Sequence, residues 1–414
     1  MLGSCFYILT RSRLNHCWSL FGTTARHILA LGLHRKKAKF QGGSGSATDL
    51  VEVECRKRLF WCAYNLDKYL SAIFGRPCAF HDDDIDQDMP ALVEDEFLTA
   101  DSITVAGRAN MNVMLGPLSH QRLGRILSSI LRRLYGIKPL DLVAQYETMS
   151  ELGAEVEAWR QRLPAFLDPE KVDSRLLIPL FQRQSNLLSL AMGHARILIY
   201  RPCLFNDYQQ IDATETKANI QKCVEAAMGI VEVIDRMVEA NQFCAASWFA
   251  HYQAFCAVVV LYTYTIRSRG EDTSTWMRYF RAAERCQGQV VTVAGFDSLA
   301  YRFFVIMEEF RSEVVKLLQH CSAGPGASKN HSNGSRGSSG GQEPQDMSAA
   351  FLPAESSSIQ WPGNETQVDQ FGLLDLPNWE QLDSLVCYGT ITHRSVTSEV
   401  NVLTCCIRLS ISVG

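Results

Sequence analysis

Residues 51–74 place the strongest constraint on the fold, because their apolar side chains recur at the spacing of a helix. The positions that repeat every three or four residues are Leu59, Cys62, Leu66, Leu70 and Ile73. This spacing predicts an amphipathic α-helix with one apolar stripe facing a core. Gly75 can end such a helix, and Pro77 prevents its continuation.

Helical periodicity continues along the chain to about residue 319. A second clear helix is predicted at 140–163, where one face carries Leu142, Tyr146, Met149, Val156, Trp159 and Leu163. We expect further helices at 119–135, 177–200, 215–239, 245–267, 274–293 and 297–320. We find no convincing alternation of apolar and polar residues with period two, which a half-buried strand would show. The sequence therefore predicts an all-α fold, an irregular multi-helix domain over residues 1–321.

Hydrophobic residues make up 47% of the 414 residues, so a sizeable core can form. The most apolar run, Phe255–Ile266, has twelve residues. A helix that spans a bilayer needs about 20 apolar residues. We therefore expect this run to be a buried helix of the core, and we expect no membrane partner.

Cysteine usage indicates reduced thiols rather than disulfides or a metal site. The chain has 14 cysteines, but no Cys-x-x-Cys pair occurs among them. Cys62, Cys223, Cys244 and Cys256 fall within apolar helical patterns, where cysteine acts as a small hydrophobic side chain. The spacing therefore predicts an intracellular protein whose cysteines are free.

The composition changes at Ala323, and the region that follows is predicted to differ from the helical domain. Residues 323–350 are rich in Gly, Ser, Asn, Gln and Pro, and they bury too little apolar surface to offset the entropy of ordering. This predicts a disordered linker over 322–368 and a disordered C-terminal tail. Residues 369–388 mix acidic residues with Phe371, Trp379 and several leucines, which is typical of an acidic-hydrophobic activation segment or of a helix that docks back on the domain. Residues 389–414 match neither pattern and stay unassigned.

The acidic run 81–88 contains one pattern that could bind metal. Asp82, Asp83 and Asp86 spell D-D-x-x-D, the magnesium-diphosphate motif of all-α terpene synthases, where oxygen ligands on successive helical turns hold magnesium ions. Here the run lies between two prolines in a predicted loop, and the second metal motif of these enzymes is incomplete. An all-α magnesium-dependent prenyl diphosphate enzyme is therefore kept as the alternative function. We assign no catalytic, cofactor-binding or metal-binding residue.

Basic residues gather at His34–Lys39, and no acidic residue precedes Asp49. Such a patch fits a nuclear import signal or a phosphate contact. It also fits the C-terminal end of a helix, where cations complement the helix dipole, and we favour this interpretation. The net charge of −4 gives no overall basic field that would attract nucleic acid.

Several of these segments together resemble a known family. Ala30–Arg35, Glu54–Trp61, Gly75–Pro77 and Asp84–Asp86 occur in the order and spacing of the middle homology region of fungal zinc-cluster transcription factors. Weaker similarities follow at Arg125–Gly136, Leu187–Leu204, Lys222–Val233 and Trp248–Tyr264, so the resemblance covers roughly residues 20–320.

The resemblance implies a nuclear, non-enzymatic regulator of RNA polymerase II genes in a fungus, acting on a metabolic or secondary-metabolite pathway. Its helical regulatory domain would restrain or relay activation, and the segment 369–388 would recruit the transcription machinery. A homodimer and a small-molecule effector are further expectations. The family normally carries a six-cysteine, two-zinc module ahead of this domain, and no such cysteine pattern occurs here. We therefore expect the domain to be N-terminally truncated. DNA contact and zinc would then belong to that module or to a partner, with no DNA-binding residue or cofactor in this chain.

The family-like residues are expected to act as a scaffold. Glu54 and Arg58 have the i,i+4 spacing of a helical ion pair. Arg56 and Arg58 are expected to pair with acidic residues. Arg76, just beyond the predicted helix end, is expected to bond free helix carbonyls or to pair with Asp67 or Asp86.

Overall fold

The computed structural model describes residues 1–11, 13–36, 49–104, 111–205, 213–268, 272–295 and 298–322. Within these ranges the regular elements are helices, with one isolated bridge between Leu98 and Ile103. The predicted all-α class is confirmed for this part of the chain. The proposed linker 322–368, the segment 369–388 and the tail 389–414 lie beyond it, apart from Ser322, the last residue of the final helix.

The helices and the short 3-10 turns follow one another along the chain in this order: α1 (Leu2–Thr10), α2 (Leu14–Ala30), α3 (Leu50–Phe74), η1 (Asp82–Asp84), η2 (Asp95–Phe97), α4 (Leu115–Leu134), α5 (Leu142–Gln161), η4 (Ala165–Leu167), η5 (Ser174–Leu176), α6 (Pro179–Tyr200), α7 (Pro202–Phe205), α8 (Ala213–Glu239), α9 (Trp248–Arg267), α10 (Thr273–Thr292) and α11 (Leu299–Ser322). Every predicted helix is present. The largest boundary error is four residues, at the start of α4, which was predicted at 119 and begins at 115.

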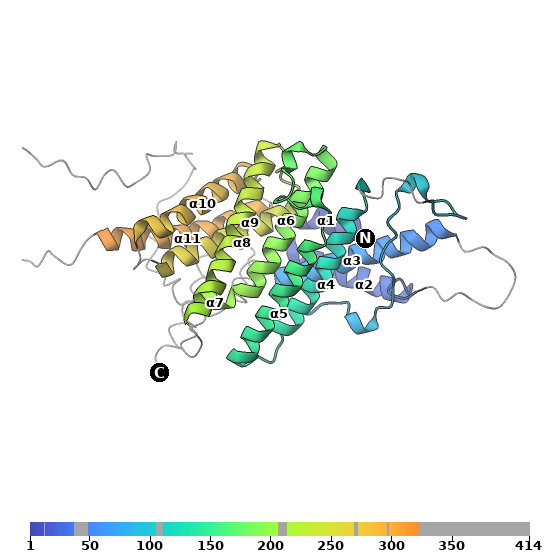
Figure 1. Ribbon diagram of the computed structural model, residues 1–414, viewed down its shortest axis with the longest axis horizontal. Coiled ribbons are helices and arrows are strands. Elements are labelled where there is room, and N and C mark those ends of the chain that lie inside the picture. Colours follow the sequence, from blue (N-terminus) through green and yellow to red (C-terminus); the bar gives the residue numbers. More distant parts are fainter. Residues whose placement is uncertain are drawn as a thin grey trace, which may run out of the picture.

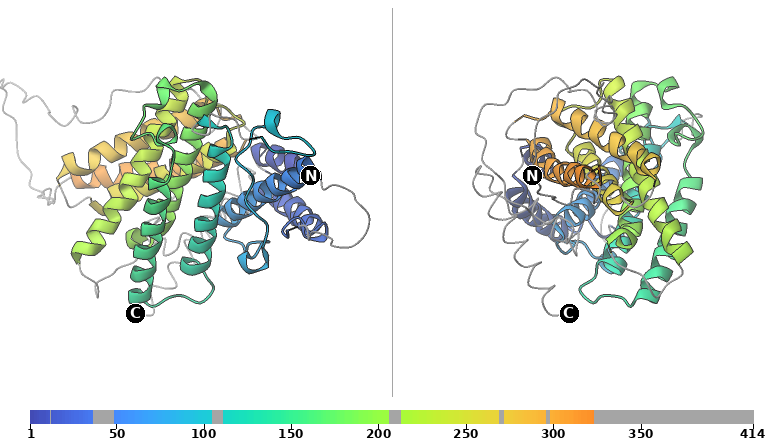
Figure 2. Two further views of the ribbon diagram at one scale, coloured as in Figure 1. Left: turned by 45° about the vertical axis from the view of Figure 1, so that its right-hand side comes forward. Right: turned by 90° about the vertical axis from the view of Figure 1, so that its left-hand side faces the viewer.

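The helices are arranged from one end of the molecule to the other in roughly their order along the chain. Figure 1 shows α2 and α3 towards one end, α10 and α11 at the other, and α4, α5, α6, α8 and α9 between them. Helices α4 and α5 stand side by side, and α5 also packs on α6 (Figure 2, left). Helix α6 packs against α8, and α8 against both α9 and α10.

Helix α9 is the centre of the C-terminal half of the core. It contacts α6, α8, α10 and α11, and the side chains from Phe249 to Tyr262 are all buried. Among the described residues it is the one helix whose length and composition would also suit a bilayer span, but 83% of its apolar window is buried inside the protein. This agrees with the buried helix that the sequence predicted.

Helix α3 is capped at both ends, and its end lies at the glycine that the sequence indicated. The Asp49 carboxylate accepts hydrogen bonds from the Val51 and Glu52 amides at 2.8 and 3.3 Å, which satisfies two free N–H groups of the first turn. Gly75 ends the helix with φ of +59°, a left-handed conformation that glycine adopts without a steric penalty.

The predicted buried stripe of α3 is partly wrong. Leu66, Leu70 and Ile73 are buried, but Leu59 is 45% exposed and Cys62 is also exposed. The side chains that face the core in this part of the helix are Phe60, Trp61 and Tyr64. From Ala63 to Phe74 every residue of α3 is buried, so the second half of the helix has no solvent-facing side. The sequence pattern of that half therefore does not indicate which side of the first half faces the core.

The cysteine predictions also divide. Cys223 and Cys256 are buried in α8 and α9, as expected of small apolar side chains. Cys244 instead lies exposed in the segment between these two helices, since α8 ends at Glu239 and α9 begins at Trp248. The cysteines that the structure describes are free.

Candidate functional site

The family-like residues of α3 hold the chain that follows the helix. We call residues 76–98 the return loop, because this segment runs back along α3 from its C-terminal to its N-terminal half. Lys68 donates to the Phe80 carbonyl at 2.6 Å, and Trp61 Nε1 donates to the Asp88 carbonyl at 2.9 Å. Nearer the start of the helix, Glu54 accepts from the Ala91 amide at 2.9 Å. The backbone N–H and C=O groups of an irregular loop have no regular helix or sheet partners. Polar side chains of α3 provide hydrogen-bond partners for these groups in the return loop.

The return loop starts at a buried ion pair. Lys68 Nζ lies 3.0 Å from Asp67 Oδ2, and neither side chain is exposed. The Asp67 carboxylate also accepts from the Ala79 and Phe80 amides at 2.8 and 3.1 Å. Lys68 lies 4.5 Å from the centroid of the Tyr64 ring as well. Both charges are thus fully coordinated, which is the condition under which a buried ion pair is tolerated.

A second polar cluster holds the other end of the return loop. Glu54 is 1% exposed and accepts from Arg58 Nε at 3.1 Å, the predicted i,i+4 pair. Arg58 also donates to the Val93 carbonyl at 2.9 Å and pairs with Asp95. Arg58 therefore finds its acidic partners, and it joins α3 to the return loop by side-chain and backbone contacts together.

Arg56 and Arg76 attach α2 to α3. Arg56 donates to the carbonyl of Leu31 at 2.9 Å, just past the end of α2, rather than pairing with a distant acid. Arg76 donates to Asn15 at 2.8 Å, and its guanidinium lies 5.2 Å from the centroids of the Trp18 and Phe74 rings. Arg76 thus contacts side chains of α2, and the Asp67 carboxylate is held by Lys68.

The acidic run does not form the arrangement that a terpene-synthase motif needs. Asp82 and Asp83 lie in a single 3-10 turn, not on successive turns of an α-helix. One Asp82 oxygen accepts from the Tyr64 hydroxyl and the other from Ser128 at 2.7 Å. Burial, together with the hydrogen bond to Asp82, raises the pKa of Tyr64, so this phenol stays a neutral donor. No group of three or more metal-ligating side chains occurs in the part of the chain that the structure describes.

The basic segment after α2 meets the rest of the acidic run. Arg35 Nε lies 3.3 Å from an Asp86 oxygen, and the Lys36 amide donates to the other oxygen at 2.8 Å. Lys36 Nζ lies 2.7 Å from Asp88. These groups are about half exposed, so they contribute little to stability. Helix α2 ends at Ala30, and Arg35 and Lys36 pair with carboxylates of the return loop, so the predicted position at a helix end is wrong for these two residues. Lys37 and Lys39 lie outside the described residues.

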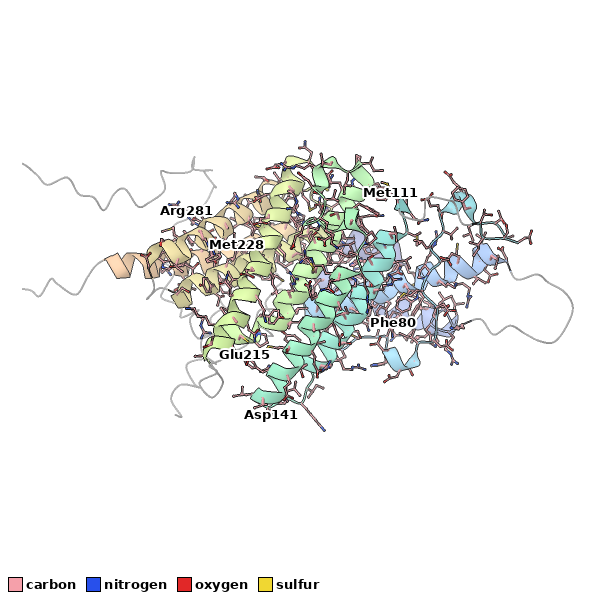
Figure 3. All side chains as sticks on the ribbon, viewed as in Figure 1. Phe80, Met111, Asp141, Glu215, Met228 and Arg281 are labelled. Atoms are coloured by element: carbon pink, nitrogen blue, oxygen red, sulfur yellow. The ribbon has the colours of Figure 1, made fainter. Side chains whose placement is uncertain are left out.

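A cavity of about 770 Å³ is the second candidate site, and no motif in the sequence predicted it. It lies along α8 and is bounded by α5 and α6 on one side and by α10 on the other. Its lining includes Met192 of α6, Met228 and Gly229 of α8, and Tyr279 of α10. Figure 3 marks Met228 on α8. The cavity is thus remote in sequence from the family-like segments of α3 and the return loop, and much of its lining comes from the weaker family-like segments Leu187–Leu204 and Lys222–Val233.

The charges around this cavity are unevenly paired. Glu157 and Arg196 form an ion pair at 3.0 Å. Lys222 donates to the Asn219 side chain at 3.1 Å and lies 5.1 Å from the Tyr200 ring centroid. Among the described residues, no carboxylate lies within 4.0 Å of the cationic nitrogens of Lys222, Arg236 or Arg278.

The comparison with protein families concerns the first helices and the return loop. Residues 2–161 match the fungal specific transcription factor domain. These residues are thus similar to that family. The match begins at the start of α1, earlier than the resemblance indicated, and ends with α5, so the cavity between α5, α6, α8 and α10 lies mostly beyond it.

Curated relatives of this family are transcription regulators by name. The chain is 26% identical to "Activator of stress genes 1" of Saccharomyces cerevisiae over 75% of this chain and 33% of that protein. It is 26% identical to the "ABC-transporter-regulating transcription factor" of Aspergillus fumigatus over 63% of this chain and 30% of that protein. "Pyrimidine pathway regulatory protein 1" of S. cerevisiae is 31% identical over 31% of this chain and 14% of that protein.

The chain spans a third or less of the length of each of these relatives. No solved structure matches the chain significantly.

Proposed function

We propose that this chain is the regulatory part of a fungal transcription regulator that acts on RNA polymerase II genes in the nucleus. The observation that carries the proposal is the family match over residues 2–161, together with relatives named as transcription regulators. The α3–return-loop scaffold lies inside the matched range and explains the family-like residues as structural. The later helices, with their cavity, are proposed to receive the signal to which the regulator responds.

DNA contact in this proposal comes from a zinc module or from a partner protein, not from the described helices. A homodimer would place two such modules on one DNA site, as symmetric DNA-binding proteins do. The target genes are proposed to serve metabolism or transport. Two relatives support this by name, one through ABC transporters and one through the pyrimidine pathway.

A reporter assay tests the proposal. The full chain is fused to a heterologous DNA-binding domain without activation function and expressed in yeast with a matching reporter gene. We expect reporter output to change relative to the DNA-binding domain alone. An unchanged reporter, with the fusion shown to be folded and nuclear, would contradict the proposal.

The same assay addresses the segment 369–388. Replacing Trp379 and Leu382 with alanine in the full-length fusion removes two large apolar side chains from the acidic-hydrophobic pattern. If the segment activates transcription, reporter output falls while the thermal stability of the chain is unchanged. A loss of stability with no loss of output would instead support a helix docked on the domain.

We also propose that the chain has no catalytic activity of its own. The enzyme alternative predicts magnesium-dependent turnover of a prenyl diphosphate that Asp82→Asn abolishes. Asp82 accepts hydrogen bonds from Tyr64 and Ser128, so we expect no turnover of farnesyl diphosphate with magnesium by the unmodified chain. For the same reason we expect Asp82→Asn to lose stability. Turnover above the level of a buffer control would overturn this part of the proposal.

A further inference from the structure

The cavity along α8 has the size of a small-molecule site. Its volume of about 770 Å³ falls within the range of roughly 300–1,000 Å³ that is usual for ligand pockets. Met192 and Met228 contribute flexible, polarisable side chains that adapt to apolar ligands. Tyr200 and Tyr279 add aromatic surface, and both rings are largely buried.

Gly229 lines this cavity at a position where the fold does not need a glycine. It lies within α8, where glycine is disfavoured, and a Cβ atom built on it would meet nothing within 4 Å. Gly193 on the facing helix is different, because a Cβ there would lie 2.7 Å from Ile230 and disturb the packing of α6 on α8. The missing side chain at Gly229 therefore enlarges the cavity without serving the packing of the protein.

Arg236 lines the cavity, and its guanidinium has no ion-pair partner among the described residues. Its Nε atom is enclosed by protein atoms and has no hydrogen-bond partner. Asp173 interacts with Arg236 only at longer range, and this carboxylate already binds the Arg175 side chain at 2.8 Å. A half-buried guanidinium without a carboxylate partner is best neutralised by an anionic oxygen.

We propose that this cavity binds a small amphipathic organic anion. The anionic group bonds to Arg236, and the apolar body lies across Gly229 between Met192 and Met228. The two cavity glutamates without an ion-pair partner, Glu225 and Glu232, lie at the solvent edge, where water screens their charge. As an effector site the inference rests on the proposed regulatory function, but binding itself is measured on the purified chain without any transcription.

Two fluorescent dyes of similar shape test the proposal on the full chain. Anilinonaphthalene sulfonate has an aromatic body and one negative charge, and phenylnaphthylamine has a similar body without the charge. We expect the anionic dye to bind one equivalent per chain, at least about tenfold more tightly than the neutral dye, as one charge-assisted hydrogen bond in a partly buried site allows.

Matched variants locate the site. Gly229→Leu fills the cavity, and Arg236→Gln removes the charge. Their controls are Gly288→Leu, at a glycine of α10 that also has nothing within 4 Å, and Arg281→Gln on the exposed side of α10, which Figure 3 labels. We expect both cavity variants to weaken the anionic dye about tenfold or more, and both controls to bind like the unmodified chain. Thermal unfolding confirms that each variant is folded.

Three results would overturn the inference. The first is no saturable binding of the anionic dye to the folded chain. The second is equal binding to the unmodified chain and to folded Gly229→Leu, which places the dye elsewhere. The third is equal affinity for the two dyes together with no effect of Arg236→Gln. A reporter that responds normally while dye binding fails would reject the site and leave the proposed function standing.

Discussion

Lys68 and Asp67 form an ion pair from which solvent is excluded, although they are neighbours in a helix. The Lys68 ammonium lies 3.0 Å from the Asp67 carboxylate, and both side chains are 0% exposed. The same two residues also hold the Phe80 carbonyl and the Ala79 and Phe80 amides. One pair of charges thus determines where the return loop leaves α3.

Replacing Lys68 tests this role. Lys68→Met keeps most of the side-chain volume but leaves the Asp67 charge buried without a counterion, so we expect a loss of about 3 kcal/mol in the free energy of unfolding. Equilibrium unfolding in urea measures it. The control is Lys36→Met, whose pair with Asp88 is more than half exposed and should have a much smaller effect. Equal effects of the two variants would refute a structural role for the buried pair.

Arg76 is predicted to stabilise the contact between α2 and α3. Arg76→Ala removes the hydrogen bond to Asn15 and the contacts with the Trp18 and Phe74 rings, so we expect the free energy of unfolding to fall by about 1 kcal/mol. Thermal unfolding gives the comparison with Arg175→Ala, which removes only an exposed pair and should leave the midpoint unchanged. An unchanged midpoint for Arg76→Ala would mean that this arginine is not part of the scaffold.

Two helical glycines are predicted to respond to alanine with opposite signs. Gly229→Ala should stabilise the chain by about 1 kcal/mol, because alanine favours the helix and its Cβ meets no atom within 4 Å. Gly193→Ala should destabilise it by about 1–3 kcal/mol, because Ile230 would have to move. Urea unfolding of both variants makes the comparison. Stabilisation by Gly193→Ala would show that α6 and α8 pack less closely than the structure indicates.

Stability is predicted to fall as the pH drops below about 6.5. Burial lowers the pKa of His120 and His251 to about 4 and, with a smaller effect of Arg201, that of His194 to about 3. Below the ordinary histidine pKa, the unfolded chain therefore binds more protons than the native chain. At pH 5.5 each of these histidines lowers the free energy of unfolding by about 1 kcal/mol. The stability that the three neutral histidines contribute is complete above the ordinary histidine pKa. It is lost as the pH falls from there towards their lowered pKa values.

Urea unfolding at pH 7.5 and 5.5 measures the effect while most carboxylates stay ionised. His194→Phe removes one of the three groups and should reduce the loss of stability between the two pH values by about a third. The same pH dependence in both proteins would show that the pKa of His194 does not differ between the folded and the unfolded chain.

Local signals in the sequence were sufficient for the helices and their ends. Gly75 and Pro77 act through the backbone of their own neighbours, so the end of α3 at Phe74 could be predicted from them. The order of the family-like segments likewise reflects one scaffold, in which Glu54, Arg58 and Trp61 contact a loop that follows in the same sequence. These features depend on short stretches of chain, which a single sequence displays directly.

Tertiary structure alone decided which of these residues meet and which face solvent. Periodicity placed Leu59 and Cys62 in the core, but the packing of α2 and the return loop on α3 exposes both and buries Asp67 and Lys68 instead. The cavity depends on how α5, α6, α8 and α10 pack around one another. No local sequence pattern specifies the spacing between these helices. Helix formation follows from interactions within a few residues, whereas burial and cavities arise from contacts between segments whose separation in space the sequence does not state.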